Sequence, residues 1–220
     1  MNNFLRNVSE CTKIGGYFIG TCYDGETVFE KLKKQESYSI HVDEKMIFDI
    51  QKKYKQTGFS GDKTGIGYAI DVYQESINKY ATEYLVHFEY LNQLMQDYGF
   101  VLISNVEAKS MGFPDGSGLF KDLFKQMEKE KDTKNYGKAS TMSEYEKEIS
   151  FLNRYFIFKK THNVDAKKVQ KTLMSGLEEE QVAVEPEKKK KEVKMVIRKL
   201  NKKVVLNKYE PIDIDTITKK

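Results

Sequence analysis

The stretch that decides the fold is IGGYFIGTCYDG, from Ile14 to Gly25. A Gly-Gly turn at residues 15–16 precedes Tyr17–Cys22, an apolar run bounded by glycines that predicts a short buried strand. Two turn-prone residues end the run, and residues 26–34 then carry apolar side chains at helical spacing. A strand followed by a helix in this way is typical of an α/β sheet.

Outward from this unit, the apolar spacing predicts further helices and strands on both sides. Thr82–Tyr98 is the longest amphipathic segment, with Thr82 as its expected cap and Gly99 as its expected stop. Two glycine-rich segments, 52–65 and 105–140, are expected to be mainly loops, with a short helix in the second. The other expected elements are a helix over 2–12, strands over 38–42 and 67–73, a strand over 100–104, helices over 119–127 and 142–151, and a strand over 155–160. This order predicts the second half of an α/β sheet.

One expected feature of a doubly wound fold is missing from this sequence. Such a fold binds its ligand at the carboxyl ends of its first strands, often through a glycine-rich turn between strand and helix. None of the glycine clusters here follows a buried strand and opens a helix. Either the fold is of another kind, or its first half is not in this chain.

The charge is unevenly distributed along the 220 residues. Lys and Arg number 37 and Asp and Glu 33, a net charge of +4. Residues 185–220 hold 12 basic and 6 acidic residues, so their net charge is +6 and that of residues 1–184 is −2. We therefore expect a near-neutral globular body over 1–165, a charged linker over 166–192 and a flexible basic tail over 193–220.

Several classes of protein are excluded by composition. The sequence contains no run of eighteen apolar residues, so no transmembrane helix is predicted, and its first residues do not form a secretory signal. Two cysteines, Cys11 and Cys22, are too few for a disulfide framework and fit a reducing compartment. We expect an intracellular protein of the cytoplasm or nucleus that does not bind a membrane.

Residue patterns for catalysis are weak. Cys22 ends a predicted strand, but no local motif pairs it with a histidine, and a structural cysteine is the better interpretation. His87 is interpreted as a partly exposed packing residue on the predicted helix. No metal-ligand spacing occurs, so no metal site and no catalytic acid–base pair are predicted.

Glu83 is the most informative candidate for binding. A carboxylate in the first turn of the predicted helix would favour the helix dipole, and that interpretation is sufficient. A second interpretation is a carboxylate that accepts hydrogen bonds from a guanine edge, with stacking faces supplied by Tyr68, Tyr84 and Tyr155. Asp24 is similarly open, because it fits both an ordinary turn and a loop that lines a pocket.

Three motifs in order resemble the mRNA cap guanine-N7 methyltransferases. Ile14–Gly25 is similar to the family stretch K-P-G-G-x-F-I-G-T-x-P-D-G, and Thr82–Phe88, TEYLVHF, is similar to P-E-Y/F-L-V-x-F. Ile149–Lys160, ISFLNRYFIFKK, is similar to the final strand of the family, and Gly67–Tyr73 is similar to a strand between these motifs. The resemblance covers residues 3–160.

The resemblance implies a class I, S-adenosylmethionine-dependent methyltransferase fold with seven strands. Tyr17–Cys22 would be strand five, Phe100–Ser104 strand six and Tyr155–Lys160 strand seven, with an antiparallel closing hairpin. The family motif for S-adenosylmethionine lies N-terminal to the matched region, so the cofactor-binding residues are unknown for this chain. The chain would then be the C-terminal half of a Rossmann-like sheet.

The resemblance carries over few residues. Glu83 matches the glutamate that recognises the cap guanine. A family tyrosine of the last strand falls on Asn153 by counting from the end of the motif, and on Tyr155 by residue type. The family proline of the strand-five loop is Tyr23 here. Because the family is thought to work without a general base, no catalytic residue is assigned.

Three functions are therefore open. The first is the C-terminal part of a cap guanine-N7 methyltransferase that binds the capped 5′ end of mRNA and is inactive alone. The second is a non-catalytic methyltransferase-like capping subunit that binds and activates a catalytic partner. The third is a nucleic-acid-binding protein that uses only its basic tail. The tail and the composition also resemble capping proteins of large DNA viruses, whose other capping subunits or domains would be partners.

Overall fold

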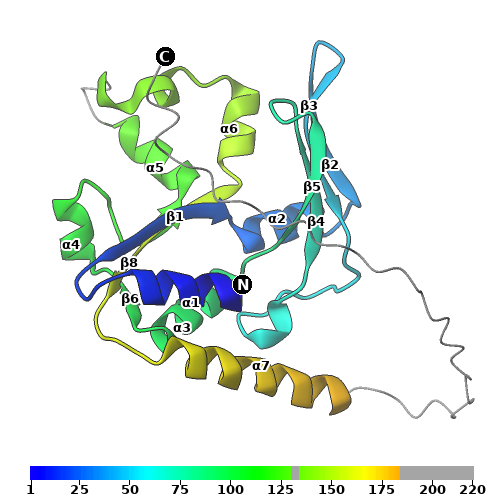
Figure 1. Ribbon diagram of the computed structural model, residues 1–220. Coiled ribbons are helices and arrows are strands. Elements are labelled where there is room, and N and C mark those ends of the chain that lie inside the picture. The colour runs from blue at the N-terminus through cyan, green and yellow to red at the C-terminus, as the bar shows by residue number, and fades with distance from the viewer. Residues whose placement is uncertain (130–133, 184–220) are drawn as a thin grey trace, which may run out of the picture. The chain divides into compact units, whose positions relative to one another are not determined.

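The computed structural model describes residues 1–129 and 134–183 (Figure 1). The expected basic tail over 193–220 and residues 184–192 of the expected linker lie outside this range. The described residues form a mixed α/β fold with two four-stranded sheets, and neighbouring strands in both sheets are antiparallel. The mixed α/β class that the sequence predicts is confirmed.

The first sheet is built around its last strand. Its strands are β1 (Tyr17–Tyr23), β6 (Phe100–Leu102), β7 (Ser117–Leu119) and β8 (Asn153–Lys160). The long strand β8 lies between β1 and β6 and runs antiparallel to both, and β7 pairs with another part of β8. Tyr17 lies opposite Lys159, and the register continues to Tyr23 opposite Asn153. Only glycine fits at position 20, because a Cβ atom there would lie 2.6 Å from the ring of Phe156.

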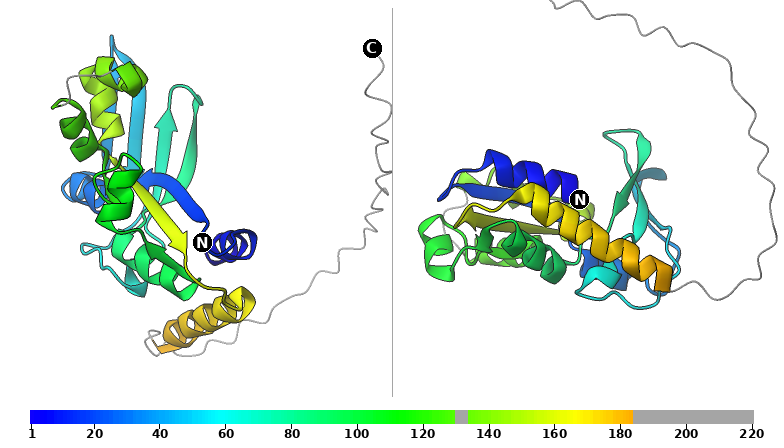
Figure 2. Two further views of the ribbon diagram at one scale, coloured as in Figure 1. Left: turned by 90° about the vertical axis from the view of Figure 1, so that its left-hand side faces the viewer. Right: turned by 60° about the horizontal axis from the view of Figure 1, so that its bottom comes forward.

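Helices cover both faces of the first sheet (Figure 2). On one face, an apolar cluster joins the sheet to α1 (Asn2–Cys11), α3 (Phe88–Asp97) and α7 (Ala166–Ala183). On the other face, a smaller cluster joins it to α4 (Asn105–Ser110) and α5 (Phe120–Met127). Both clusters bury large side chains of β8, which explains why this strand is rich in Phe and Ile.

The second sheet is a meander in the order β2 (Ser37–Val42), β3 (Lys45–Lys52), β4 (Ala69–Gln74) and β5 (Lys79–Tyr84). Its inner face packs on α2 (Gly25–Leu32) through an apolar cluster that also includes residues of α6 (Glu144–Ser150). Two short 3₁₀ segments, η1 (Lys63–Gly65) and η2 (Lys134–Thr141), lie in the connections.

Two strands of this sheet were not predicted from the sequence. β3 follows a turn in which Asp43 and Glu44 both have positive φ, a geometry more often signalled by Asn-Gly. β5 has no buried residue at all, so its sequence lacks the alternation that marks a strand. The prediction that the helix begins at Thr82 is wrong: residues 79–84 pair with β4, and the helix α3 begins at Phe88.

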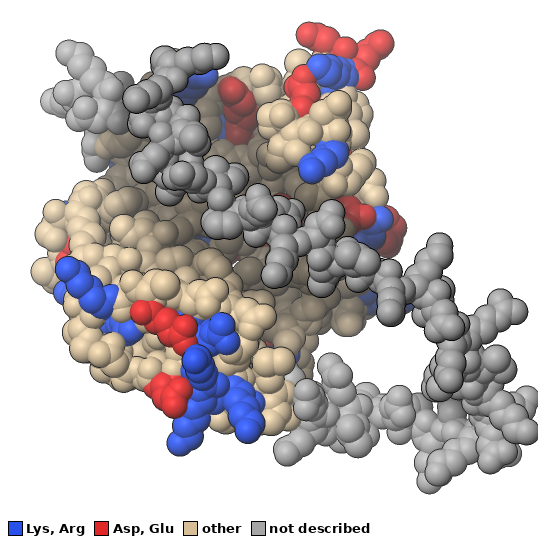
Figure 3. Space-filling view, in the orientation of Figure 1, with Lys and Arg blue, Asp and Glu red and all other residues tan. Residues whose placement is uncertain are grey.

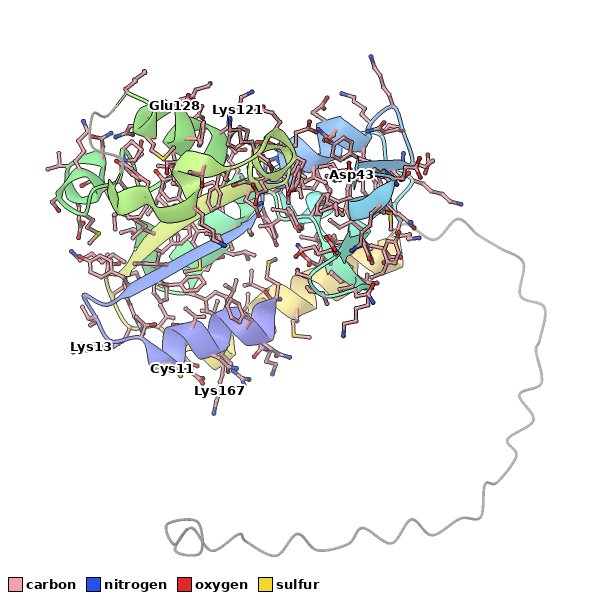
Figure 4. The ribbon with its side chains drawn as sticks, turned by 90° about the horizontal axis from the view of Figure 1, so that it is seen from above. Cys11, Lys13, Asp43, Lys121, Glu128 and Lys167 are labelled. Carbon is pink, nitrogen blue, oxygen red and sulfur yellow. The ribbon has the colours of Figure 1, made fainter. Side chains whose placement is uncertain are left out.

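The start of the expected linker is also different. Residues 166–183 form helix α7, where the sequence predicted a charged linker from residue 166. Figure 4 shows Cys11, at the end of α1, beside Lys167, at the start of α7. The two helices are held together by Arg6 Nη1, which donates a hydrogen bond to Gln170 Oε1 at 3.0 Å, and by the buried Ala166. Tertiary packing on α1 thus orders a segment whose composition is polar.

Candidate functional site

The candidate site lies at the carboxyl end of β1, where Asp24 caps helix α2. One carboxylate oxygen, Oδ1, accepts hydrogen bonds from the backbone N of Thr27 at 2.9 Å and from its Oγ1 at 2.6 Å. The other, Oδ2, accepts a hydrogen bond from Nε of Arg154 at 2.7 Å. Burial raises the pKa of Asp24, but the hydrogen bonds from Thr27 and Arg154 outweigh burial and hold that pKa below its usual value.

Arg154, on β8, connects the end of β1 to β7 and α3. Its Nη1 donates a hydrogen bond to Ser117 Oγ of β7 at 3.1 Å, and its guanidinium lies 4.4 Å from the centre of the Phe88 ring. Arg154 could not be identified from the sequence, because a single arginine in a strand carries no motif. Its role follows only from the pairing of β8 with β1, which places it opposite Cys22.

Glu83 lies on strand β5 rather than in the first turn of a helix, so the helix-dipole interpretation is wrong. It pairs with Ile70, a fully buried residue of β4, and therefore shares the inner face of the second sheet. Its charge contributes to raising the pKa of Tyr23, at the end of β1. Burial is the largest cause of the raised pKa of Tyr23, and a hydrogen bond from Gln74 Nε2, at 3.0 Å, opposes it.

Neighbouring atoms shield the Glu83 carboxylate partly from water, and no opposing interaction from the described residues lowers its pKa again. The residue is exposed overall, but surrounding atoms raise the pKa of the carboxyl above its usual value. Among the described residues, no hydrogen-bond donor or cation interacts with it. A carboxylate in this state can accept hydrogen bonds from a ligand at a low cost in desolvation.

The structure separates the two candidates on the last strand. Asn153 lies opposite Tyr23 in the β1–β8 register, and its Nδ2 donates to the carbonyl oxygens of Ile149 and Ser150 at 3.1 Å each. Tyr155 is only 4% exposed. Its ring packs in the cluster under α5, and its hydroxyl donates to the carbonyl oxygen of Asp115 at 3.0 Å.

The three tyrosines considered as stacking faces do not meet. Tyr68 is a core residue of the second sheet, and its hydroxyl donates to the carbonyl oxygen of Gly58 at 2.7 Å. Tyr155 is buried below the first sheet, while Tyr84 is exposed on the opposite side of β5 from Glu83. The charge of Glu83 acts instead on Tyr23, a residue that the sequence marks only as a departure from the family.

Other reactive side chains serve structural roles. Burial, with a contribution from the charge of Asp24, raises the pKa of Cys22 to about 11, so its thiol stays protonated at neutral pH. His87 is buried rather than partly exposed, and it precedes helix α3, with Nε2 at 3.3 Å from Glu26 Oε1. Within the described ranges, no group of three His, Cys, Asp or Glu side chains is placed to hold a metal ion.

The described residues do not build a site for S-adenosylmethionine. The turn after β1 is the one place where a glycine follows a strand and opens a helix, but a Cβ atom at Gly25 would meet the carbonyl oxygen of Val86 at 2.4 Å. This glycine therefore allows close packing of the chain on itself. Both oxygens of the neighbouring Asp24 are already bonded to Thr27 and Arg154 and cannot also hold a ribose. We derive no step of a reaction through that cofactor from these residues.

Comparison with known proteins gives the family. The model of the mRNA (guanine-N(7))-methyltransferase domain matches residues 1–161. A protein of Acanthamoeba polyphaga mimivirus, named a probable mRNA-capping enzyme, is 30% identical over 199 aligned residues, which cover 74% of this chain and 16% of that protein. The chain belongs to the mRNA (guanine-N(7))-methyltransferase domain family, as the motifs predicted, and it spans about 16% of the length of this relative.

No membrane-spanning element is found in the residues that the structure describes: each helix there is too short or too polar to cross a bilayer.

Proposed function

We propose that this chain forms the cap-guanine side of an mRNA cap guanine-N7 methyltransferase, which transfers a methyl group from S-adenosylmethionine to N7 of the cap guanosine. The observation that carries the proposal is the position of Glu83, a partly desolvated carboxylate on the inner face of the second sheet, paired with Ile70 of β4, whose charge acts on Tyr23 at the end of β1. Family membership over residues 1–161 supports the same reaction.

Guanine fits this carboxylate by its chemistry. Its Watson–Crick edge carries two neighbouring N–H donors, on N1 and N2, which a carboxylate can accept together. Methylation at N7 gives the base a positive charge, so Glu83 also favours the charge that develops during transfer. Adenine presents no such pair of donors at this edge, and the site would therefore discriminate between the two purines.

Asn153 is the better candidate for a second contact on the last strand. It lies opposite Tyr23, next to the proposed guanine site, whereas the ring of Tyr155 is buried under α5. Tyr23 takes the place of the family proline and offers an aromatic face at the same loop. In this proposal Glu83 reads the base, while Tyr23 and Asn153 position it.

The free edge of β1 supports a sheet that is completed by another segment. Within the described residues, β1 pairs only with β8, and its outward edge carries no Lys or Pro that would discourage pairing. Ile19 of this strand is 60% exposed, and Phe4, Ile14 and Tyr17 nearby are also exposed. Acidic and basic side chains are intermixed on the face seen in Figure 3, so an apolar partner meets no large area of one charge there. We propose that the S-adenosylmethionine-binding half of a class I methyltransferase pairs with β1.

Capped mRNA is the proposed substrate, and other capping-enzyme domains or subunits are the proposed partners. The relative in mimivirus is named a probable mRNA-capping enzyme, and an intracellular, viral setting is in keeping with that name. A non-catalytic subunit that activates a methyltransferase is the second candidate, because the described residues build no cofactor site of their own.

A transfer assay separates the two candidates. Radiolabelled S-adenosylmethionine and GpppA are supplied to the pure chain, to the S-adenosylmethionine-binding half of a family member, and to both together. The first candidate predicts transfer only in the mixture, and loss of that transfer when Ile19→Lys blocks the edge. Transfer by the family half alone, merely accelerated by the chain, would favour the activating subunit, and transfer by the pure chain would contradict the proposal that β1 needs a partner.

A further inference from the structure

The outer face of the second sheet carries a group of tyrosines that the proposed cap site does not use. We call Tyr73, Tyr80 and Tyr84 the tyrosine face. Their positions alternate with the inner-face residues of β4 and β5, so all three rings lie on the side away from α2. Figures 1 and 2 show α2 on one side of this sheet and no described helix on the other.

Two of these rings are open to solvent. Tyr84 is 62% exposed and Tyr80 is 44% exposed, on an edge strand whose six residues are all exposed. Tyr73 lies directly across from Tyr80, and their ring centres are 5.4 Å apart. Large aromatic side chains in such a row on an uncovered sheet are unusual for a surface that only faces water.

A hydrogen-bonded network beneath the rings fixes their positions. Asp49, which is 2% exposed although it lies on the outer face, accepts a hydrogen bond from the Tyr80 hydroxyl at 2.8 Å. It also accepts hydrogen bonds from Ser39 Oγ at 2.6 Å and Gln51 Nε2 at 2.9 Å. Because the hydroxyl of Tyr80 is held, its ring loses little further freedom when a flat ligand stacks on it.

The carboxylates that lie among these tyrosines already have partners. Asp71 accepts a hydrogen bond from Thr82 Oγ1 at 2.7 Å and forms an ion pair with Lys53 at 3.1 Å. Asp49 is bonded to three neutral donors. A ligand that binds here must therefore be held by ring contacts more than by charge.

We propose that the tyrosine face stacks the bases of single-stranded RNA that follow the cap. Tyr84 is the next residue to Glu83, and β5 is an edge strand, so a chain that leaves the proposed guanine site can pass over this edge onto the tyrosine face. Exposed aromatics on a sheet are a common platform for single-stranded RNA, since every base has a π-face. The choice of RNA as the ligand rests on the proposed function, whereas the exposure and arrangement of the three tyrosines do not depend on it.

The experiment measures affinity of the full chain for GpppA, for the same cap extended by about six nucleotides of single-stranded RNA, and for the extended RNA without its cap. Salt is set at about 0.5 M, where contacts from the basic tail are strongly screened. We expect the extension to raise affinity by about tenfold, in keeping with one or two stacked bases. That gain should disappear in Tyr84→Ala and remain in Tyr84→Phe, which keeps the ring.

Ile77→Ala is the matched control, because Ile77 is 54% exposed at the turn between β4 and β5 and lies outside the tyrosine face. It should keep the gain. An extension that adds no affinity, or a gain that survives Tyr84→Ala, would overturn the proposal. A dimer in sedimentation that dissociates on Tyr84→Ala would also overturn it, in favour of contact between two copies.

This experiment keeps the two proposals apart. If GpppA binds in a Glu83-dependent way but the extension adds nothing, the tyrosine face fails and the cap site stands. If GpppA does not bind, while the uncapped RNA binds in a Tyr84-dependent way, the cap site fails and the tyrosine face stands.

Discussion

The Nε atom of Arg154 donates a hydrogen bond to Oδ2 of Asp24 at 2.7 Å, and this bond joins the ends of the two strands that flank the candidate site. The residues just before them in the chain, Asn153 and Tyr23, lie opposite each other in the β1–β8 register. The ion pair therefore fixes the spacing of the two side chains proposed to position the guanine.

Breaking this pair should destabilise the fold. Asp24→Asn leaves the guanidinium of Arg154 without its charged partner, in a site where the Asp24 side chain is 4% exposed and that of Arg154 18% exposed. Removal of one member of a buried pair costs about 3–5 kcal/mol, which urea unfolding can measure. Asp122→Asn is the control, since its ion pair with Lys125 is exposed and should contribute about 0–1 kcal/mol. Equal losses in both variants would contradict this account.

The same pair predicts a pH dependence. The pKa of Asp24 is lowered in the folded state, so its contribution to stability is present above the usual carboxyl pKa and is lost as pH falls through the lowered value. The difference in stability between the wild type and Asp24→Asn should shrink as the solution becomes strongly acidic. A difference that grows on acidification would show that another group dominates.

Glu83 should behave in the opposite way. Its pKa is raised in the folded state, so the ionised carboxylate lowers the stability of the fold. This loss of stability is absent below the usual glutamate pKa and is complete once the pH has risen through the raised value. Glu83→Gln should therefore raise the melting temperature slightly at neutral pH and leave it unchanged near pH 4. A carboxylate that lowers stability where it stands is typical of a binding site. A neutral-pH melting temperature that falls in Glu83→Gln would argue for a structural role.

The edge of β1 can be tested by comparing two isoleucines that face each other. Ile19 and Ile157 are partners in the β1–β8 register, but Ile19 is 60% exposed and Ile157 is fully buried. Ile157→Ala should cost about 2–5 kcal/mol, whereas Ile19→Lys should change stability by no more than about 0.5 kcal/mol. Chemical unfolding of the pure chain measures both, and a large loss in Ile19→Lys would mean that β1 is already covered.

The sequence predicts β1, β6 and β8 of the first sheet, because these strands contain apolar runs bounded by glycine or by a helix stop, but it misses β7, which lies in a segment expected to be mainly loop. The expected strands Tyr17–Cys22 and Tyr155–Lys160 correspond to β1 and β8, which are slightly longer, and Gly99 has the positive φ that ends a helix. The second sheet was half predicted. β5 is polar and fully exposed, and its register depends on the hairpin at Asn78 rather than on an apolar pattern. Pairing with β4 therefore overrides the helical spacing of Tyr84, Leu85 and Phe88.

The candidate site was predicted only in part, for a related reason. The family resemblance singled out Glu83, but its position on strand β5, opposite Ile70, depends on the pairing of β5 with β4. Arg154 could not be predicted at all, since an isolated arginine gains its meaning only from Asp24, 130 residues away in the chain. Local patterns reveal strands and caps, whereas ion pairs of this kind appear only once the sheet is assembled.

The two cysteines should differ in reactivity. Cys11 is exposed at the end of α1, whereas burial raises the pKa of Cys22 to about 11. At pH 8 a thiol reagent should therefore label Cys11 much faster, because only the thiolate reacts. Mass spectrometry of the native chain measures the order of labelling, and Cys11→Ser should leave one slow thiol that becomes fast on unfolding. Rapid labelling of Cys22 in the native state would contradict its assignment as a structural residue.

The most direct test of the cap site uses a cap that lacks a single donor. IpppA replaces guanine by hypoxanthine and so loses the N2 amino group that Glu83 is proposed to accept. Calorimetric titration of the full chain should show GpppA binding about tenfold or more tightly than IpppA, as expected for a hydrogen bond to a charged group. Glu83→Gln should remove that preference. Glu75→Gln, which changes a carboxylate in the turn between β4 and β5 that pairs with Lys45, should keep it. Equal affinity for the two caps in the wild type, or an unchanged preference in Glu83→Gln, would contradict the central claim that Glu83 reads the cap guanine.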